Sequence, residues 1–242
     1  MDTRKTELWN SVDALAAGIA HEINNPLGII AQEAELASYL LQTPTLQDNM
    51  EVKDCRDSLR EISRQVDRCR EIIGKLLNLA RQRDPVFQRT DVNGLIEEMT
   101  NLVAMDKRRE KIVRIVKDIQ PRLPVIQTDP PLLRQVILNL LNNGIQAIEN
   151  EGTVCIATVH SGDGVEISIT DTGCGISTEN LKKIFTPFFT TKPQGQGTGL
   201  GLAICRAIVE RLGGVIKVSS EPGRCTAFTV RLPIEGPLRG ER

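Results

Sequence analysis

A histidine that could act as a nucleophile lies near the start of the chain, in the segment Ala20-His21-Glu22-Ile23-Asn24-Asn25-Pro26-Leu27. Its neighbour Glu22 could hold or accept a proton at one ring nitrogen, which would leave the other nitrogen free to react. Asn25 follows one helical turn later on the same face, where its amide could orient a phosphoryl group or a water. The zinc motif His-Glu-x-x-His is excluded, because Asn25 stands in place of the second histidine. A single helical histidine can also be a plain polar surface residue.

Two asparagines in a predicted helix near residues 131–149, Asn139 and Asn143, lie one turn apart on one side. Carbonyl oxygens in that arrangement can hold a magnesium ion while phosphates supply its remaining ligands. Two asparagines on a helix are, however, more commonly exposed to solvent without a ligand.

A predicted strand over Val165–Thr170 leads into the segment Asp171-Thr172-Gly173-Cys174-Gly175-Ile176. A carboxylate at a strand end can accept a hydrogen bond from the exocyclic amine of a ring. The two glycines allow the backbone to approach a flat ring and to adopt positive φ. Such turns are common, so this signal is weak by itself, and Cys174 is most simply a small filler residue.

A phosphate-binding segment is indicated after residue 184. Three of the five phenylalanines fall within 185–189 and, beside a flexible loop, are expected to anchor it to the core; Lys192 could then reach a phosphate. The glycines before the next helix, Gly195-Gln196-Gly197-Thr198-Gly199-Leu200-Gly201, would present backbone N–H groups and the positive helix end to phosphates. The segment fits neither the P-loop pattern nor the dinucleotide-binding pattern GxGxxG.

Two helices are predicted to position His21. The first carries an apolar stripe, and the second carries a heptad seam of Leu59, Ile62, Val66, Cys69, Ile73, Leu76 and Ala80, with a loop at 42–45 between them. A lone pair of helices buries only one face of each seam, and two chains side by side would form a four-helix bundle. We therefore expect a homodimer; the alternative is a hairpin packed on its own C-terminal domain.

The pattern changes after Pro85, where β-branched strands and helical stretches follow without regular βαβ alternation. Strands are predicted at 113–116, 154–159, 165–170, 215–218 and 227–232, and helices near 92–105, 131–149 and 200–212. This mixture predicts an α+β protein in which a helical hairpin precedes an α/β sandwich with helices on one face of a mixed sheet.

Composition limits the classes of function. The 242 residues suffice for two compact units, and a net charge of −1 provides no basic field for nucleic acid or anionic lipid. Six cysteines without CxxC spacing fit reduced thiols of a cytoplasmic protein. No apolar stretch reaches the roughly 18 residues of a membrane span, and no signal peptide opens the chain. We expect no membrane contact from this segment, which could still be the cytoplasmic portion of a longer membrane-bound sensor.

Five segments in order resemble the motif set of sensor histidine kinases of two-component systems: those at His21, Asn139–Asn143, Asp171–Gly175, Phe185–Phe189 and Gly197–Gly201. The segments His-Glu-Ile-Asn-Asn-Pro-Leu and Pro-Phe-Phe-Thr-Thr-Lys most resemble those of the nitrogen-regulation branch. The resemblance implies a kinase that phosphorylates its own histidine and passes the phosphoryl group to an aspartate of a response-regulator receiver domain, with an additional regulator phosphatase activity.

The resemblance also implies residue roles. His21 matches the phosphoacceptor, Glu22 the general base for its phosphorylation, and Asn25 the position implicated in dephosphorylating the regulator. Asn143 matches the Mg²⁺ ligand, and Asp171 the carboxylate that recognises adenine. The other residues implied to bind ATP are Asn139, Gly173, Gly175, Ile176, Lys192, Gly197, Thr198, Gly199, Leu200 and Gly201.

One departure concerns Gln146, where many relatives have a basic residue that contacts phosphate. Lys192 is then the expected phosphate cation, with Arg134 as the alternative. The resemblance further implies a dimerisation and phosphoacceptor domain at 1–84 and a catalytic ATP-binding domain of Bergerat type at 85–242.

Two rival functions are an ATPase like gyrase or the mismatch-repair proteins, and a dimerisation module that has lost nucleotide binding. The first usually needs a glutamate base on the helix that carries Asn139 and Asn143.

Overall fold

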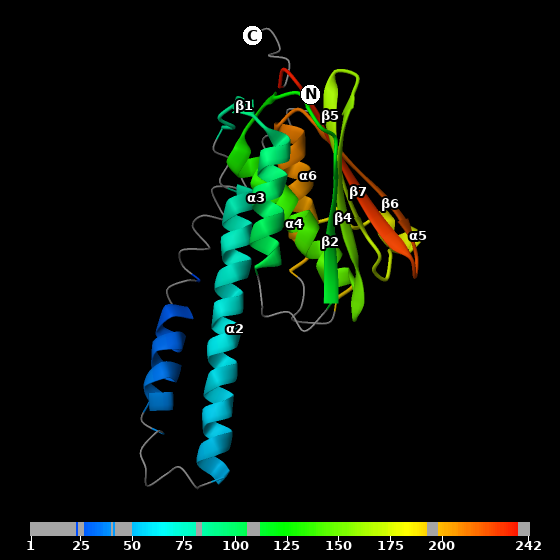
Figure 1. The fold of residues 1–242 in the computed structure, drawn as a ribbon. Coiled ribbons are helices and arrows are strands. Elements are labelled where there is room, and N and C mark those ends of the chain that lie inside the picture. The colour runs from blue at the N-terminus through cyan, green and yellow to red at the C-terminus, as the bar shows by residue number, and fades with distance from the viewer. Residues whose placement is uncertain are drawn as a thin grey trace. The chain divides into compact units, whose positions relative to one another are not determined.

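The computed structural model describes residues 23, 27–39, 41, 50–80, 84–105, 112–192 and 198–236. The chain divides into two compact units, Met1–Arg83 and Asp84–Arg242 (Figure 1). Within the described ranges, no helix combines the length and the apolar character that crossing a bilayer requires.

The first unit contains a helical segment at 27–39 and the long helix α2, Met50–Ala80. Ala34 of the first segment is buried, as are Val66 and Ile73 of α2, so part of the predicted seam of α2 is covered within one chain. Ile62 of the same seam is 41% exposed. The expected stripe of the first helix and the loop at 42–45 lie outside the described residues, as do the side chains of the seam beyond residue 74.

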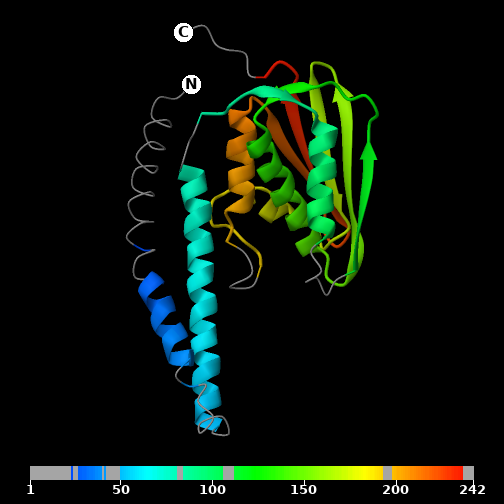
Figure 2. The same cartoon turned by 60° about the vertical axis from the view of Figure 1, so that its left-hand side comes forward.

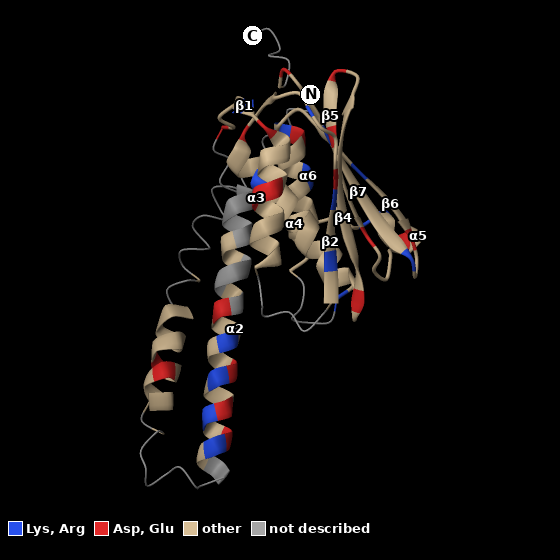
Figure 3. Ribbon diagram, in the orientation of Figure 1, with Lys and Arg blue, Asp and Glu red and all other residues tan. Residues whose placement is uncertain are grey.

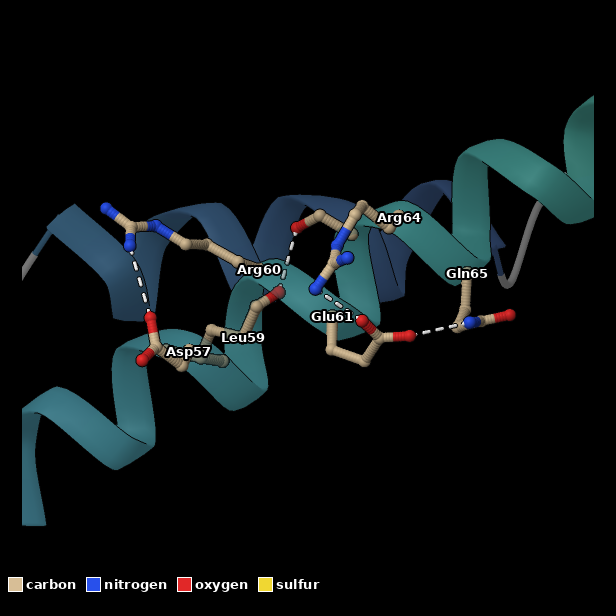
Figure 4. A network of polar contacts seen from close by, with 7 residues as sticks. Asp57, Leu59, Arg60, Glu61, Arg64 and Gln65 are labelled. Carbon is tan, nitrogen blue, oxygen red and sulfur yellow. Dashed lines mark hydrogen bonds and ion pairs between the residues drawn. The ribbon is translucent and has the colours of Figure 1, made fainter. Parts of the chain in front are cut away.

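The outer surface of α2 is lined with charged residues of both signs (Figure 3). Arg60 Nη1 pairs with Asp57 Oδ1 at 3.2 Å, Arg64 pairs with Glu61, and Gln65 Nε2 donates to Glu61 Oε1 at 2.7 Å (Figure 4). These pairs connect positions three or four apart and are exposed, so each contributes only a few tenths of a kcal/mol. They indicate a solvent-facing side of α2.

The second unit is built on a five-stranded sheet with strand order β2-β4-β5-β7-β6. Its strands are β2 (Ile112–Ile119), β4 (Glu151–Ser161), β5 (Gly164–Asp171), β6 (Val215–Glu221) and β7 (Cys225–Pro233). The pair β2 and β4 is parallel, and the other neighbours are antiparallel. A separate antiparallel pair joins β1 (Gln88–Thr90) to β3 (Ile126–Thr128).

Helices α3 (Val92–Ala104), α4 (Pro130–Ala147) and α6 (Gly201–Arg211) lie on one face of this sheet (Figures 1 and 2). A short helix, α5 (Thr178–Leu181), precedes α6. Along β5, Val165, Ile167 and Ile169 are buried and alternate with half-buried polar residues, so one face of the strand forms the core. The predicted α+β fold is confirmed, and the strands and helices predicted in this half all occur. The β1–β3 pair and α5 were not predicted.

Candidate functional site

The start of α4 is fixed by Asp129, a residue that was not among the expected site residues. The Asp129 Oδ1 atom accepts a hydrogen bond from the Leu132 N–H at 3.1 Å, and two prolines occupy the first helical positions. This is the geometry of a strong N-cap. The Oδ2 atom accepts from the Val86 N–H at 2.7 Å, so one buried carboxylate holds both the start of α4 and the segment that precedes β1. The sequence signal was Asp-Pro-Pro before an apolar helix.

The two asparagines of α4 have different surroundings. Asn139 is half-buried and lies within hydrogen-bonding reach of the Cys205 thiol of α6, whose Sγ donates to the Val136 carbonyl oxygen at 3.9 Å. Burial raises the pKa of Cys205 to about 12, and the bond from Asn139 opposes that rise. Asn143 is also half-buried, but within the described part of the chain no group hydrogen-bonds its amide. Asn143 therefore has the side-chain oxygen that is better able to accept a ligand.

Asp171 lies at the end of β5 and is only 3% exposed. Its Oδ1 accepts a hydrogen bond from the Gly173 N–H at 2.9 Å, whereas no described group hydrogen-bonds Oδ2. Burial raises the pKa of this carboxyl above its ordinary value, and the bond from Gly173 works in the opposite direction. A buried carboxylate with one unused oxygen is suited to accept a hydrogen bond from a ligand amine.

The backbone of α4 comes close to this carboxylate at Gly144. A Cβ added to Gly144 would lie 3.2 Å from Asp171 Cβ and 3.6 Å from Asp171 Oδ2. The residue before it in the chain is Asn143, so the stretch of α4 backbone that carries Asn143 lies next to Asp171.

The loop after β5 is fastened to two neighbours. The Cys174 N–H donates to the Ala147 carbonyl at the end of α4 at 3.1 Å, and a Cβ at Gly173 would come within 2.5 Å of that carbonyl oxygen. Gly175 has φ of +67°, and a Cβ there would lie 2.3 Å from the Glu221 carbonyl. Both positions therefore require glycine, but the close contacts are with carbonyls of the chain itself, and the positive φ expected at both occurs at Gly175 and not at Gly173. The N–H of the next residue, Ile176, donates to the Ser220 hydroxyl at 2.8 Å.

The phenylalanine segment and the start of α6 are joined by a hydrogen bond from the Phe188 N–H to the Gly199 carbonyl at 3.0 Å. The expectation that these aromatics anchor the loop is wrong for Phe188, which is 62% exposed at φ of +67°. The apolar anchors are instead Ile184 and Leu200, both buried. Thr198 Oγ1 accepts from the Leu200 N–H at 3.4 Å directly before α6.

Lys192 reaches α4. Its Nζ donates a hydrogen bond to Oε1 of Gln146, which lies three positions after Asn143. Arg134, the alternative phosphate cation, is instead paired with Glu98 of α3 at 2.9 Å. The structure therefore places Lys192 beside α4, at the helical turn that follows Asn143.

The expected site is thus described in part. Asn139, Asn143, Asp171, Gly173, Gly175, Ile176, Lys192, Thr198, Gly199, Leu200 and Gly201 belong to one unit of the fold. His21, Glu22, Asn25 and Gly197 lie outside the described residues. No group of three or more His, Cys, Asp or Glu residues that could hold a metal occurs among the described positions.

Two protein-family models match the chain. Residues 128–236 match the "Histidine kinase-, DNA gyrase B-, and HSP90-like ATPase" model, and residues 11–85 match the "His Kinase A (phospho-acceptor) domain" model. The two ranges together cover about three quarters of the chain. Sensor histidine kinase ZraS of Escherichia coli (strain K12) is 38% identical over 233 residues, which are 96% of this chain and 48% of ZraS. The catalytic domain of histidine kinase ThkA is 31% identical, with a TM-score of 0.56 over 62% of this chain and 97% of that domain. The chain belongs to the sensor histidine kinase family.

This histidine kinase chain spans about half the length of the curated relatives it matches. Two longer solved structures share its fold. Full-length ShkA in complex with AMPPNP is 25% identical, with a TM-score of 0.74 over 92% of this chain and 46% of ShkA. ThkA in complex with the response regulator protein TrrA is 26% identical, with a TM-score of 0.65 over 91% of this chain and 61% of ThkA. The predicted family is confirmed.

Proposed function

We propose that this chain is the catalytic core of a protein-histidine kinase, which transfers the γ-phosphate of ATP to His21 and then to an aspartate of a receiver domain. The observation that carries the proposal is the buried carboxylate of Asp171, with its unused Oδ2 beside Gly144 of α4, the residue that follows Asn143. A carboxylate with one oxygen bound to its own loop and the other available fits recognition of a ring amine.

Adenine recognition follows from this arrangement. The exocyclic amine of adenine donates to Asp171 Oδ2, while the Gly173 N–H keeps Oδ1 in place. Because Gly173 and Gly175 have no side chains, the adenine ring can lie against the loop backbone, and Ile176 offers an apolar contact. Hydrogen bonds to a charged acceptor contribute about 1.5–3 kcal/mol, which is enough to distinguish an amine from a carbonyl at the same ring position.

The residues present fit Mg²⁺ together with the phosphates of ATP. Asn143 supplies a neutral amide oxygen that no described group hydrogen-bonds, and Mg²⁺ commonly takes few protein ligands besides phosphates and waters. Asn139, one turn earlier, supports the phosphate site from its position against Cys205. When bound, Mg²⁺ would offset the negative charge that develops on the phosphates during transfer.

The phosphates are bound by a cation and by backbone N–H groups. Lys192 provides an ammonium group near α4, and the segment Gly197, Thr198, Gly199, Leu200 and Gly201 leads into the positive N-terminal end of α6. We assign the lid over the nucleotide to this segment.

Transfer to histidine is a single displacement. A nitrogen of His21 forms a bond to the γ-phosphorus while the bond from that phosphorus to the bridging oxygen breaks, and ADP leaves. Glu22 accepts the proton from the other ring nitrogen, so that the phosphohistidine is not left as a cation. Asn25 orients the water that later removes the phosphoryl group from the receiver aspartate.

We further propose that residues 1–84 form the dimerisation and phosphoacceptor domain and residues 85–242 the catalytic ATP-binding domain. The dimer is supported by apolar side chains of the helical unit that a single chain leaves exposed: Ile23, Ile29, Ile30, Leu36, Tyr39 and Ile62. A second copy would cover them in a four-helix bundle. The partner of the phosphorylated chain is a receiver domain, as TrrA is the partner in the ThkA complex. This segment acts in the cytoplasm, without contact to nucleic acid or membrane.

The proposal is tested by incubating the purified chain with γ-³²P-ATP and Mg²⁺. We expect a label that is lost in acid and kept in alkali. The matched variants are His21→Ala and His160→Ala, because these are the only two histidines of the chain. Label that persists in His21→Ala and disappears in His160→Ala would overturn the assignment. Nucleotide binding with ATP hydrolysis but no label would favour the ATPase alternative.

A further inference from the structure

Gln146 is a hydrogen-bond partner of Lys192, the expected phosphate cation. The Lys192 Nζ donates a hydrogen bond to Gln146 Oε1, across 46 positions of the chain. The backbone of Lys192 is held as well, because its N–H donates to Thr190 Oγ1 at 3.2 Å. Two contacts, one of the side chain and one of the backbone, therefore fix the position of Lys192.

Gln146 shares a helix face with the two asparagines. The spacings from Asn139 to Asn143 and from Asn143 to Gln146 are four and three positions, which is the pattern of neighbours on one side of a helix. Gln146 itself is exposed, whereas Lys192 is half-buried. The ammonium group is thus kept next to the face of α4 on which Asn143 can accept a ligand.

We propose that Gln146 is a positioning residue for ATP: it holds the Lys192 ammonium at the phosphate end of the nucleotide site before ATP arrives. This inference rests on the proposed ATP site. A lysine side chain has many rotamers, and ordering it only when ATP binds would weaken binding. Gln146 orders it in advance.

The chemistry of the amide suits this task. A carboxylate at position 146 would form an ion pair with Lys192 and would repel the phosphates. An apolar side chain would offer the ammonium no acceptor. The neutral amide oxygen is a weaker acceptor than a phosphate oxygen, so it orients the ammonium and then gives way to the ligand. The residue therefore acts through Lys192 and not by replacing it.

A double-mutant cycle in the full chain tests the inference. The four proteins are the wild type, Gln146→Ala, Lys192→Met and the double variant, and the Kd values of ATP with Mg²⁺ and of AMP are measured by calorimetry. Gln146→Ala should weaken ATP binding about three- to tenfold, the size expected for one hydrogen bond. AMP binding should stay unchanged, because AMP lacks the β- and γ-phosphates. The double variant should bind ATP as Lys192→Met does, since the two effects are coupled.

The outcomes separate this inference from the proposed function. A wild-type chain that binds neither ATP nor AMP would defeat the proposed function. A wild type that binds ATP, with Gln146→Ala equally tight or with additive losses in the double variant, would overturn only the role of Gln146. Equal losses for ATP and AMP would also overturn it, because a general distortion of the site would then explain the effect. Unfolding midpoints in urea should agree among the four proteins.

Discussion

Gly144 of α4 lies against Asp171 of β5 so closely that an added Cβ would be 3.2 Å from Asp171 Cβ. This contact ties the helix that carries Asn143 to the carboxylate proposed to recognise adenine. Because Asp171 is buried in the sheet, it cannot move away from α4 without disturbing its strand pairs with Val154 and Thr226.

Gly144→Ala is therefore expected to weaken ATP binding several-fold and to lower the free energy of unfolding by about 1–3 kcal/mol, the cost of overpacking. Calorimetry and urea unfolding measure the two effects. Gly94→Ala is the matched control: its Cβ would lie 3.1 Å from Asp91 Oδ2, the far end of an exposed side chain that can move. We expect Gly94→Ala to lower neither the affinity for ATP nor the free energy of unfolding. Equal losses in both variants would contradict the account.

Asp171→Asn should bind ATP roughly ten- to a hundredfold more weakly, because the variant places an amide where a charged acceptor is needed. GTP binding should not fall in parallel, since guanine has a carbonyl at the equivalent ring position. The measurement is a pair of nucleotide titrations on each protein. An Asp171→Asn variant that binds ATP as the wild type does would remove Asp171 from adenine recognition.

The difference in stability between Asp171→Asn and the wild type should depend on pH. Burial raises the pKa of Asp171 in the folded protein, so the folded state holds this proton more tightly than the unfolded state does. The resulting stability is fully present below the unfolded pKa and is lost as pH rises through the folded pKa. Asp171→Asn avoids this loss, so its Tm should rise relative to wild type as pH increases toward neutrality. A Tm difference independent of pH between acid and neutral conditions would contradict the burial argument.

Replacing Asn139 and replacing Asn143 by alanine should have different effects on ATP binding and on stability. Asn143→Ala should reduce the affinity for ATP about tenfold or more when Mg²⁺ is present and little when EDTA removes it, with unchanged stability. Asn139→Ala should also lose about 1 kcal/mol of stability, because the half-buried amide beside the Cys205 thiol is removed. Titrations with and without Mg²⁺, together with urea unfolding, test both statements. A loss in Asn143→Ala that does not depend on Mg²⁺ would exclude it as the ligand.

Association of two chains should depend on the exposed apolar face of the helical unit. Ile62→Glu would place a charge in the proposed bundle and is expected to weaken the dimer more than tenfold. Leu102→Glu in α3 is the control, since Leu102 is 55% exposed, against 41% for Ile62, but belongs to the other unit. Sedimentation equilibrium gives the masses. A wild type that stays monomeric, or equal effects of both changes, would refute the proposed interface.

Local patterns predicted much of the fold, whereas the ligand-binding roles of the site residues stay predictions. The period-two alternation of Val165–Thr170 predicted both β5 and its buried face, since every second side chain points to the core. Of the two glycines expected to adopt positive φ, Gly175 does so and Gly173 does not, and the expected approach of their backbone to a flat ring stays a prediction.

Contacts between distant positions could not be predicted in this way. The hydrogen bond from Lys192 to Gln146 joins residues 46 apart, and the bond from Val86 to Asp129 joins residues 43 apart. Neither leaves a periodic signal, because each depends on how the helices and strands pack. The exposed position of Phe188 was missed for the same reason. An aromatic side chain suggests a core residue, but the backbone of Phe188 is held by its hydrogen bond to Gly199.

The most direct test of the central claim is to locate the transferred phosphoryl group. The chain is incubated with ATP and Mg²⁺, digested at alkaline pH, and its peptides are sequenced by tandem mass spectrometry. The account predicts a phosphoryl group on His21 and none on His160, and it predicts that Asn143→Ala lowers the yield. A phosphoryl group on another residue, or ATP consumed with no modified peptide, would contradict it.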